Sequence, residues 1–266
     1  MSNMFNNAEA LNQPLDFDTS SVTDMRSMFH LASAFNQPLN FNTSKVITMK
    51  GMFHAYSRVS AFNQPLSFDT SSVEIMSYMF AATPQGESAF NQPLSFDTSK
   101  VTDMRNMFEK ATAFNQPLSL DTTSVTTMWY MFRGAHKFNQ PLSWDTSKVT
   151  DMRNMFDTTR VFNQPLSLDT TSVTTMREMF RHAFKFNQPL SFDTSKVTNM
   201  IGVFAEAQAF NQPLSWDLSK VTTMSGIFSG ADSLSDANKL LIRCAWAGTS
   251  VFNYNARSPE TWDMQT

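Results

Sequence analysis

Cysteine, glycine and long apolar runs are scarce in this sequence. Their scarcity argues against disulfides, flexible linkers and membrane-spanning helices, respectively. Cys244 is the only cysteine, so no disulfide can form within the chain. Seven glycines and no glycine- or serine-rich tract argue against flexible linkers. No run of about 18 apolar residues is present, so membrane insertion through a spanning helix is not expected. Residues 1–10 lack the charged and then apolar order of a signal peptide, which leaves the compartment open.

Charge and catalytic motifs are equally sparse. The formal net charge is -3, so no overall basic field is present to attract nucleic acid. No serine–histidine–aspartate arrangement, phosphate-binding loop or cysteine–histidine cluster can be argued from the spacing of residues. His30 and His54 could approach one another, but two imidazoles without a third ligand give a weak metal signal. We therefore expect neither an enzyme nor a resident cofactor.

What the chain does have is a 24-residue unit, FNQPLSFDTSKVTDMRNMFEKATA at residues 90–113, which occurs nine times. We number its positions as places 1 to 24, and the units as one to nine. The units begin at Leu11, Phe35, Phe62, Phe90, Phe114, Phe138, Phe162, Phe186 and Phe210. Units two and three carry insertions at the same point, around 56–58 and 83–86, and stacking would place them side by side. A fixed period of this length indicates a stacked repeat architecture.

The period divides the chain into three parts. Residues 1–10 match the last third of a unit, residues 11–234 hold the nine-repeat array, and residues 235–266 form a C-terminal cap and tail. Because the array opens within a unit, its first face has no polar cap. We interpret this end as the truncation of a longer array or, alternatively, as an edge used for self-association.

Two patterns predict the local structure of the unit. Leu-Ser-Phe-Asp at places 5 to 8 alternates with period two, which is typical of a short strand with one buried face. The apolar places 12, 15, 18, 19 and 22 are mostly three or four residues apart, which predicts a short helix or helical turns. Methionines at places 15 and 18 would fill the interior. Because crossovers between parallel strands are almost always right-handed, we predict a right-handed α/β solenoid.

A capping helix is predicted after the array. Ser235 and Asp236 form a good helix start, and Gly248 can end the helix. Such a helix would cover the apolar end of the array. Its packed face would consist of Leu240, Leu241, Cys244, Ala245 and Ala247.

The repeat itself resembles a known family. FNQPLSFDTSKVTDMRNMF is similar to the repeat of BspA-like leucine-rich-repeat surface proteins, in the form also seen in mycoplasma-type lipoproteins, and the likeness covers about residues 11–234. The segment ADSLSDANKLLIRCAWAG resembles the closing segment of algal and protist members. The resemblance implies a leucine-rich-repeat-like solenoid, display at the cell surface, adhesion and protein–protein contact. It implies no catalytic residues.

Three rows of recurring polar residues have alternative interpretations. The asparagine and glutamine at places 2 and 3 would bond neighbouring units together, or bind glycans. The threonine at place 9 would stabilise turns, or form an ice-binding plane. The aspartate at place 8 would bond the following turn, as Asn42 could in unit two, or bind a divalent cation such as calcium. The candidates for cation binding are Asp97, Asp121, Asp145, Asp169 and Asp193.

Places 16, 17, 20, 21, 23 and 24 vary between units, and these places and the two insertions carry tyrosine, tryptophan and arginine, the side chains most typical of interface hot spots. The candidates for partner binding are Trp129, Tyr130, Tyr78, Tyr56, Arg58, Arg105 and Arg153. The leading hypothesis is a non-catalytic scaffold that binds a protein or a glycan. The alternative is a structural array that organises ice or ions through its aspartate or threonine rows.

Overall fold

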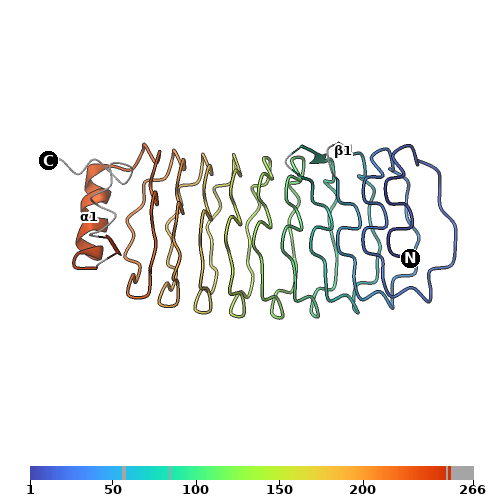
Figure 1. The fold of residues 1–266 in the computed structure, drawn as a ribbon, viewed down its shortest axis with the longest axis horizontal. Helices are drawn as coiled ribbons and strands as arrows, with labels where there is room; N and C mark the ends of the chain where they lie inside the picture. The colour runs from blue at the N-terminus through green and yellow to red at the C-terminus, as the bar shows by residue number, and fades with distance from the viewer. Residues whose placement is uncertain (56–57, 84, 250, 253–266) are drawn as a thin grey trace.

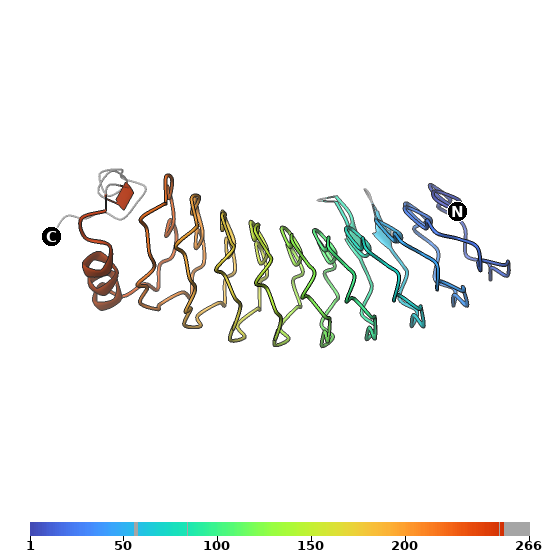
Figure 2. The ribbon, with the colours of Figure 1, turned by 90° about the horizontal axis from the view of Figure 1, so that it is seen from below.

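The computed structural model describes residues 1–55, 58–83, 85–249 and 251–252. The units follow one another as stacked coils, and helix α1 (Asp236–Trp246) lies at the end of the stack formed by unit nine (Figure 1). Seen from below, the stack follows a shallow arc (Figure 2). The tandem array predicted from the period is confirmed at this level.

A ladder of single parallel bridges runs through the stack at place 14. In unit four Asp103 bridges Thr127, and the same place is joined from Asp24 in unit one to Thr223 in unit nine. At place 5 the bridges are fewer, with Leu94 paired to Leu118 as an example. The strand predicted for places 5 to 8 is therefore reduced to isolated bridges in the described part of the coils.

Two short strands follow directly after the insertions of units two and three. Strand β1 (Val59–Ser60) pairs in parallel with strand β2 (Glu87–Ser88), in register Val59 with Glu87. The amide of Thr83 also donates to the carbonyl of Ala55 at 3.0 Å. The insertions thus lie side by side, as predicted.

The second half of each coil is a run of β-turns, and the prediction of helical turns is wrong there. In unit four the amides at places 18, 20 and 22 donate to carbonyls three residues back, at 3.3, 3.1 and 3.0 Å. The amides at places 17, 19 and 21 donate instead to the next coil, at 3.0, 2.9 and 2.7 Å. A helix would direct every amide to its own chain four residues back. In this chain every second amide of the segment donates to the neighbouring coil. The apolar spacing that predicted a helix belongs to consecutive β-turns.

These turns need residues with positive φ at places 17 and 21. Asn106 and Lys110 have φ of 56° and 55° in unit four, whereas Gly226 occupies place 17 of unit nine with φ of 62°. Positive φ at the third residue is the mark of a type II turn. Most residues other than glycine are strained there, and Tyr130 adopts this conformation with φ of 60°.

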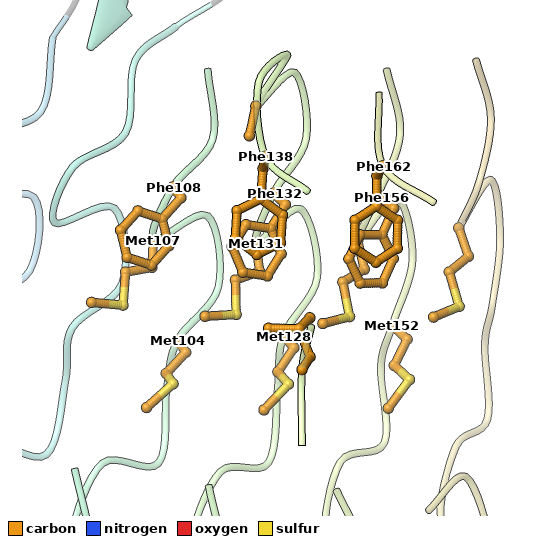
Figure 3. Close-up of a cluster of buried hydrophobic side chains, with 14 of the residues drawn as sticks. Met104, Met107, Phe108, Met128, Met131, Phe132, Phe138, Met152, Phe156 and Phe162 are labelled. Carbon is orange, nitrogen blue, oxygen red and sulfur yellow. The ribbon is translucent and has the colours of Figure 1, made fainter. Parts of the chain in front are cut away.

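The core is a column of aromatic rings flanked by methionines (Figure 3). Phe132 stacks on Phe138 at a centroid distance of 4.1 Å and on Phe156 of the next coil at 5.8 Å. Met128 and Met131 are fully buried beside it. Burying a phenylalanine or methionine side chain contributes about 1.5–3 kcal/mol, and the set recurs along the stack, with Val203 and Ile227 replacing one methionine in units eight and nine.

Residues 1–10 continue this pattern as the closing part of a coil. The amides of Asn3 and Phe5 donate to the carbonyls of Arg26 and Met28, each at 2.9 Å. The ring of Phe5 stacks on Phe29 at 5.5 Å. This segment therefore has the register that its sequence match predicts.

Helix α1 starts where the sequence predicts, but it packs through another face. The Ser235 side chain caps it by accepting from the Asn238 amide at 3.3 Å. Trp246 is buried and stacks on Phe228 at 6.0 Å, at the end of the aromatic column. Ile242 is the other buried helix residue.

The predicted face of Leu240, Leu241, Cys244, Ala245 and Ala247 is exposed instead. Leu240 and Leu241 are 59% and 55% exposed. The buried face is that of Ile242 and Trp246 instead, and Asn238, one helical turn before Ile242, donates to the Asn211 side chain at 2.8 Å. Burial of the two apolar side chains, together with this bond, which extends the asparagine row into the helix, accounts for the rotation of the helix.

Replacing Gly226 by valine should lower the free energy of unfolding by about 1–2 kcal/mol, because a left-handed backbone is costly for a residue with a Cβ. A Cβ at this position would meet nothing closer than the Ser229 Cβ at 3.8 Å, so crowding is not the cause. Urea unfolding measures the effect. The matched control is Ser225→Val on the adjacent exposed residue, with an expected change within about 0.5 kcal/mol. Equal losses in both variants would contradict the explanation.

Candidate functional site

The asparagine and glutamine rows bond the coils to one another. The Asn115 side-chain oxygen accepts from the Asn139 amide at 2.9 Å and from the Gln140 side chain at 3.1 Å. The contact from asparagine to the next coil's amide recurs from Asn12 to Asn211. The structural interpretation of these rows is confirmed, because the asparagine oxygens accept and the glutamine side-chain nitrogens donate within the stack.

The threonine row at place 9 is buried, so its interpretation as an ice-binding plane is wrong. Thr146 is fully buried, and its hydroxyl donates to the carbonyl of Asp169 in the next coil at 2.8 Å. The other threonines of the row are at most 2% exposed. A plane for ice must lie open to solvent, whereas these threonines are buried, and all but Thr70 donate their hydroxyl to a carbonyl of the next coil.

A second threonine row, at place 13, is exposed and was missed by the sequence analysis. Its hydroxyls donate to the carbonyl of the preceding coil, as Thr198 does to Thr174 at 3.2 Å. The alternation of buried valine at place 12 with polar place 13 was the available signal. The row consists of Thr102, Thr126, Thr150, Thr174, Thr198 and Thr222.

The aspartates at place 8 bond their own turns. Asp145 accepts from the Ser147 amide at 2.9 Å and from its hydroxyl at 2.7 Å, and these bonds lower the pKa of the carboxyl. Asn42 does the same with Ser44. The five candidates Asp97, Asp121, Asp145, Asp169 and Asp193 share this contact. Within the described residues, no three histidine, cysteine or acidic side chains are placed to hold a metal ion. Cation binding by this row stays a prediction.

Four of the partner-binding candidates meet on neighbouring coils. Trp129 lies between two guanidinium groups, with Arg105 at 5.5 Å and Arg153 at 5.4 Å from the ring centroid. Tyr130 meets the Trp129 ring edge to face at 5.1 Å. A cation over an aromatic face contributes about 0.5–1 kcal/mol at an exposed site. Both sides of the indole are thus occupied by arginine.

A third arginine, which sequence analysis did not select, extends this cluster. Arg133 lies 5.1 Å from the centroid of Tyr130 and forms ion pairs with Glu109 at 2.9 Å and Asp157 at 3.3 Å. Burial raises the pKa of Glu109, against the opposing effects of Asn106 and Arg133. The sign of charge alternates along place 20 from Glu109 to Arg133 to Asp157, and this pattern was the available signal.

Of the remaining candidates, Tyr78 lies next to this cluster and Arg58 lies apart from it. The amide of Tyr78 donates to the carbonyl of Arg105 at 3.1 Å, which places it one coil away on the same side. Arg58 pairs instead with Glu9 at 3.2 Å. Tyr56 lies outside the described residues. We call the set Tyr78, Arg105, Trp129, Tyr130, Arg133 and Arg153 the aromatic–arginine patch.

The carboxylates that pair with these arginines lie deeper than the guanidinium groups. The Arg105 side chain is 35% exposed and its partner Asp103 16%, with a nitrogen–oxygen distance of 3.1 Å. Arg153 is 47% exposed and its partner Asp151 15%. The outer surface of the patch therefore carries guanidinium and aromatic groups.

A family model described as "Mycoplasma protein of unknown function, DUF285" matches the chain three times, over residues 1–88, 84–169 and 166–258. The chain belongs to this family. No curated protein and no solved structure matches the chain. The DUF285 matches run through all nine units and helix α1, which agrees with the mycoplasma side of the resemblance seen in the repeat.

Within the described residues of this DUF285 chain, no helix is both long and apolar enough to cross a bilayer.

Two histidines of the DUF285 chain form a stacked pair on the turn side of units one and two. The rings of His30 and His54 lie 5.1 Å apart and nearly parallel. Burial, followed by the neighbouring His30, lowers the pKa of His54 to about 4. The neutral form of His54 is therefore favoured in the fold.

This pair predicts a loss of stability in mild acid. The folded pKa of His54 is depressed below the unfolded value of 6.5, so its stabilisation is present above pH 6.5 and is lost as the pH falls toward 4. Between pH 7.5 and pH 5 the free energy of unfolding should fall by about 2 kcal/mol from this group. Urea unfolding of the wild type and His54→Phe measures the difference. The variant keeps a ring in the stack, and an equally steep loss in it would assign the effect to other groups.

The aspartate row predicts a distinction between two substitutions. Asp121→Asn should change the free energy of unfolding by less than about 0.5 kcal/mol, because Asn42 already makes this turn contact, whereas Asp121→Ala should cost about 1 kcal/mol. Thermal unfolding with and without calcium chloride checks both. If the row bound calcium, the metal would raise the melting temperature of the wild type and Asp121→Asn would reduce that shift.

Proposed function

We propose that this chain is a non-catalytic repeat scaffold that presents an extended surface for protein or glycan binding, in the manner of a cell-surface or adhesion module. The observation that carries the proposal is the aromatic–arginine patch. It joins tyrosine, tryptophan and arginine, the residues that dominate binding hot spots, on adjacent coils. The recurring polar rows elsewhere form hydrogen bonds within the stack. The chemical differences between units therefore lie at the variable places.

The finer assignment of fold and location belongs to the same proposal. The parallel ladder at place 14 and the stacked coils support a right-handed solenoid of the BspA-like, leucine-rich-repeat kind. A position at the cell surface follows from that resemblance. Self-association through residues 1–10 stays a prediction, and Met4 is 51% exposed in that segment.

The test is binding of the 266-residue chain to an array of glycans and extracellular-matrix proteins. Trp129→Ser/Tyr130→Gly should lose the specific signals, because it removes both rings and introduces the Ser225-Gly226 pair of unit nine. That pair already occupies the same turn, so the variant should keep its thermal stability. Arg26→Ala, on the same face in unit one, serves as the matched control and should keep the signals. Signals that survive in the double variant would refute the patch as the binding site.

The second candidate function is an array that organises ions along its aspartate row. Its support is that the place-8 carboxylates are exposed and recur in eight of the nine units. The threonine row at place 9 no longer supports this candidate. A signal on the array that requires calcium and survives in the double variant would favour it.

A further inference from the structure

The chemistry of the aromatic–arginine patch narrows the kind of partner it fits, and this inference rests on the proposed function. Sugar rings bind proteins largely by stacking on the open face of an aromatic side chain. Both sides of the Trp129 ring are occupied, by Arg105 at 5.5 Å and Arg153 at 5.4 Å. Arg133 lies over the Tyr130 ring at 5.1 Å. Both faces of Trp129 and one face of Tyr130 therefore hold guanidinium groups, and the Trp129 ring offers a partner its edge.

The guanidinium groups keep donors free for a partner. Arg153 contacts Asp151 through Nε and one terminal nitrogen, and Arg105 lies 3.1 Å from Asp103 through Nε. A guanidinium carries five N–H donors, so donors remain on the outer side of each group. Their carboxylate partners hold them in place and lie deeper in the surface. The two arginines are two coils apart, or roughly 10 Å at the spacing of parallel chains.

The same ion pairs argue against a long polyanion. A polyanion such as nucleic acid or a sulfated glycan binds through a broad uncompensated positive field. Here each arginine has its own carboxylate, and the chain as a whole has a formal charge of -3. What remains is a short-range site with fixed donors and apolar ring edges.

We infer that the patch binds an acidic segment of a partner protein, whose carboxylates pair with Arg105 and Arg153 while an apolar side chain packs on the ring edges of Trp129 and Tyr130. Arginine suits this role because its planar fork matches a carboxylate with two parallel hydrogen bonds. The stacking on Trp129 orders both guanidinium groups in advance, so less side-chain entropy is lost on binding.

The experiment uses two fluorescein-labelled peptides and the full 266-residue chain. One peptide repeats the triplet Glu-Glu-Leu, and the other repeats Gln-Gln-Leu. Fluorescence anisotropy should show at least tenfold tighter binding of the glutamate peptide. Arg105→Gln/Arg153→Gln should abolish this preference, and the corresponding lysine double variant should lose part of it, because lysine keeps the charge without the planar fork.

Arg26→Gln is the matched control. Arg26 pairs with Asp24 at 2.7 Å in the same way and is 57% exposed, but no described aromatic ring lies against it. This variant should bind the glutamate peptide as the wild type does. Thermal unfolding of every variant checks that the fold is intact. An equal loss of peptide binding in Arg26→Gln would mean that the peptide responds to the overall charge of the chain and not to the patch. This result would overturn the inference.

Two further outcomes would also overturn it. Equal or absent binding of the two peptides would refute an acidic segment as the partner, even if the matrix array still gave signals that depend on Trp129. Tighter, arginine-dependent binding of a heparin hexasaccharide would reassign the patch to sulfated glycans. In contrast, signals on the matrix array that survive replacement of Trp129 and Tyr130 would refute the patch as the binding site of the proposed function. The failure of this inference and the failure of the proposed function can therefore be distinguished.

Discussion

The fold depends on one arrangement of backbone hydrogen bonds, in which alternate amides serve the coil itself and the coil beside it. Between Asn106 and Ala111 the amides alternate: one donates to the neighbouring unit, and the next closes a β-turn. Each coil is thereby held shut and held to its neighbour by the same short segment. The backbone of this segment thus forms hydrogen bonds both within its own coil and to the next coil, although the described coils contain no long strand or helix. It also explains why residues such as Tyr130 and Lys110 adopt positive φ despite its cost.

Once the coils are locked at a fixed spacing, every place in the unit becomes a row along the stack. Rows with identical residues satisfy themselves: Asn115 bonds the next asparagine amide, Thr146 the next carbonyl, and Phe132 the next ring. Such rows stabilise the molecule but leave few groups for a partner. Recognition then falls to the places where units differ, and Trp129 between two arginines is the densest example.

Much of this could be read from the sequence, because a period translates directly into neighbours. The insertions, the closing register of residues 1–10 and the meeting of Trp129 with Arg105 and Arg153 all follow from equal places in successive units. The β-turns in the second half of each coil could not be predicted, because apolar spacings of three and four residues fit both a helix and consecutive β-turns. The packed face of α1 could not be predicted either, because the side chains of Trp246 and Ile242 are buried there in place of Leu240. The burial of the place-9 threonines was not predicted either, because a threonine at the start of a turn can face solvent or donate to the next coil, as Thr146 does.

Units that are nearly interchangeable create a hazard while the chain folds, since any coil could dock against the wrong neighbour with its aromatic column intact. The side chains at place 20 distinguish the central junctions. Glu109 meets Arg133, and Arg133 meets Asp157, so the sign of charge reverses at each step. If one unit were looped out, Glu109 would face Asp157 in a largely buried position, where two carboxylates repel strongly. The charges thus favour the correct order of the coils. A stack that omits a coil is destabilised by electrostatic repulsion, although its apolar core would still fit.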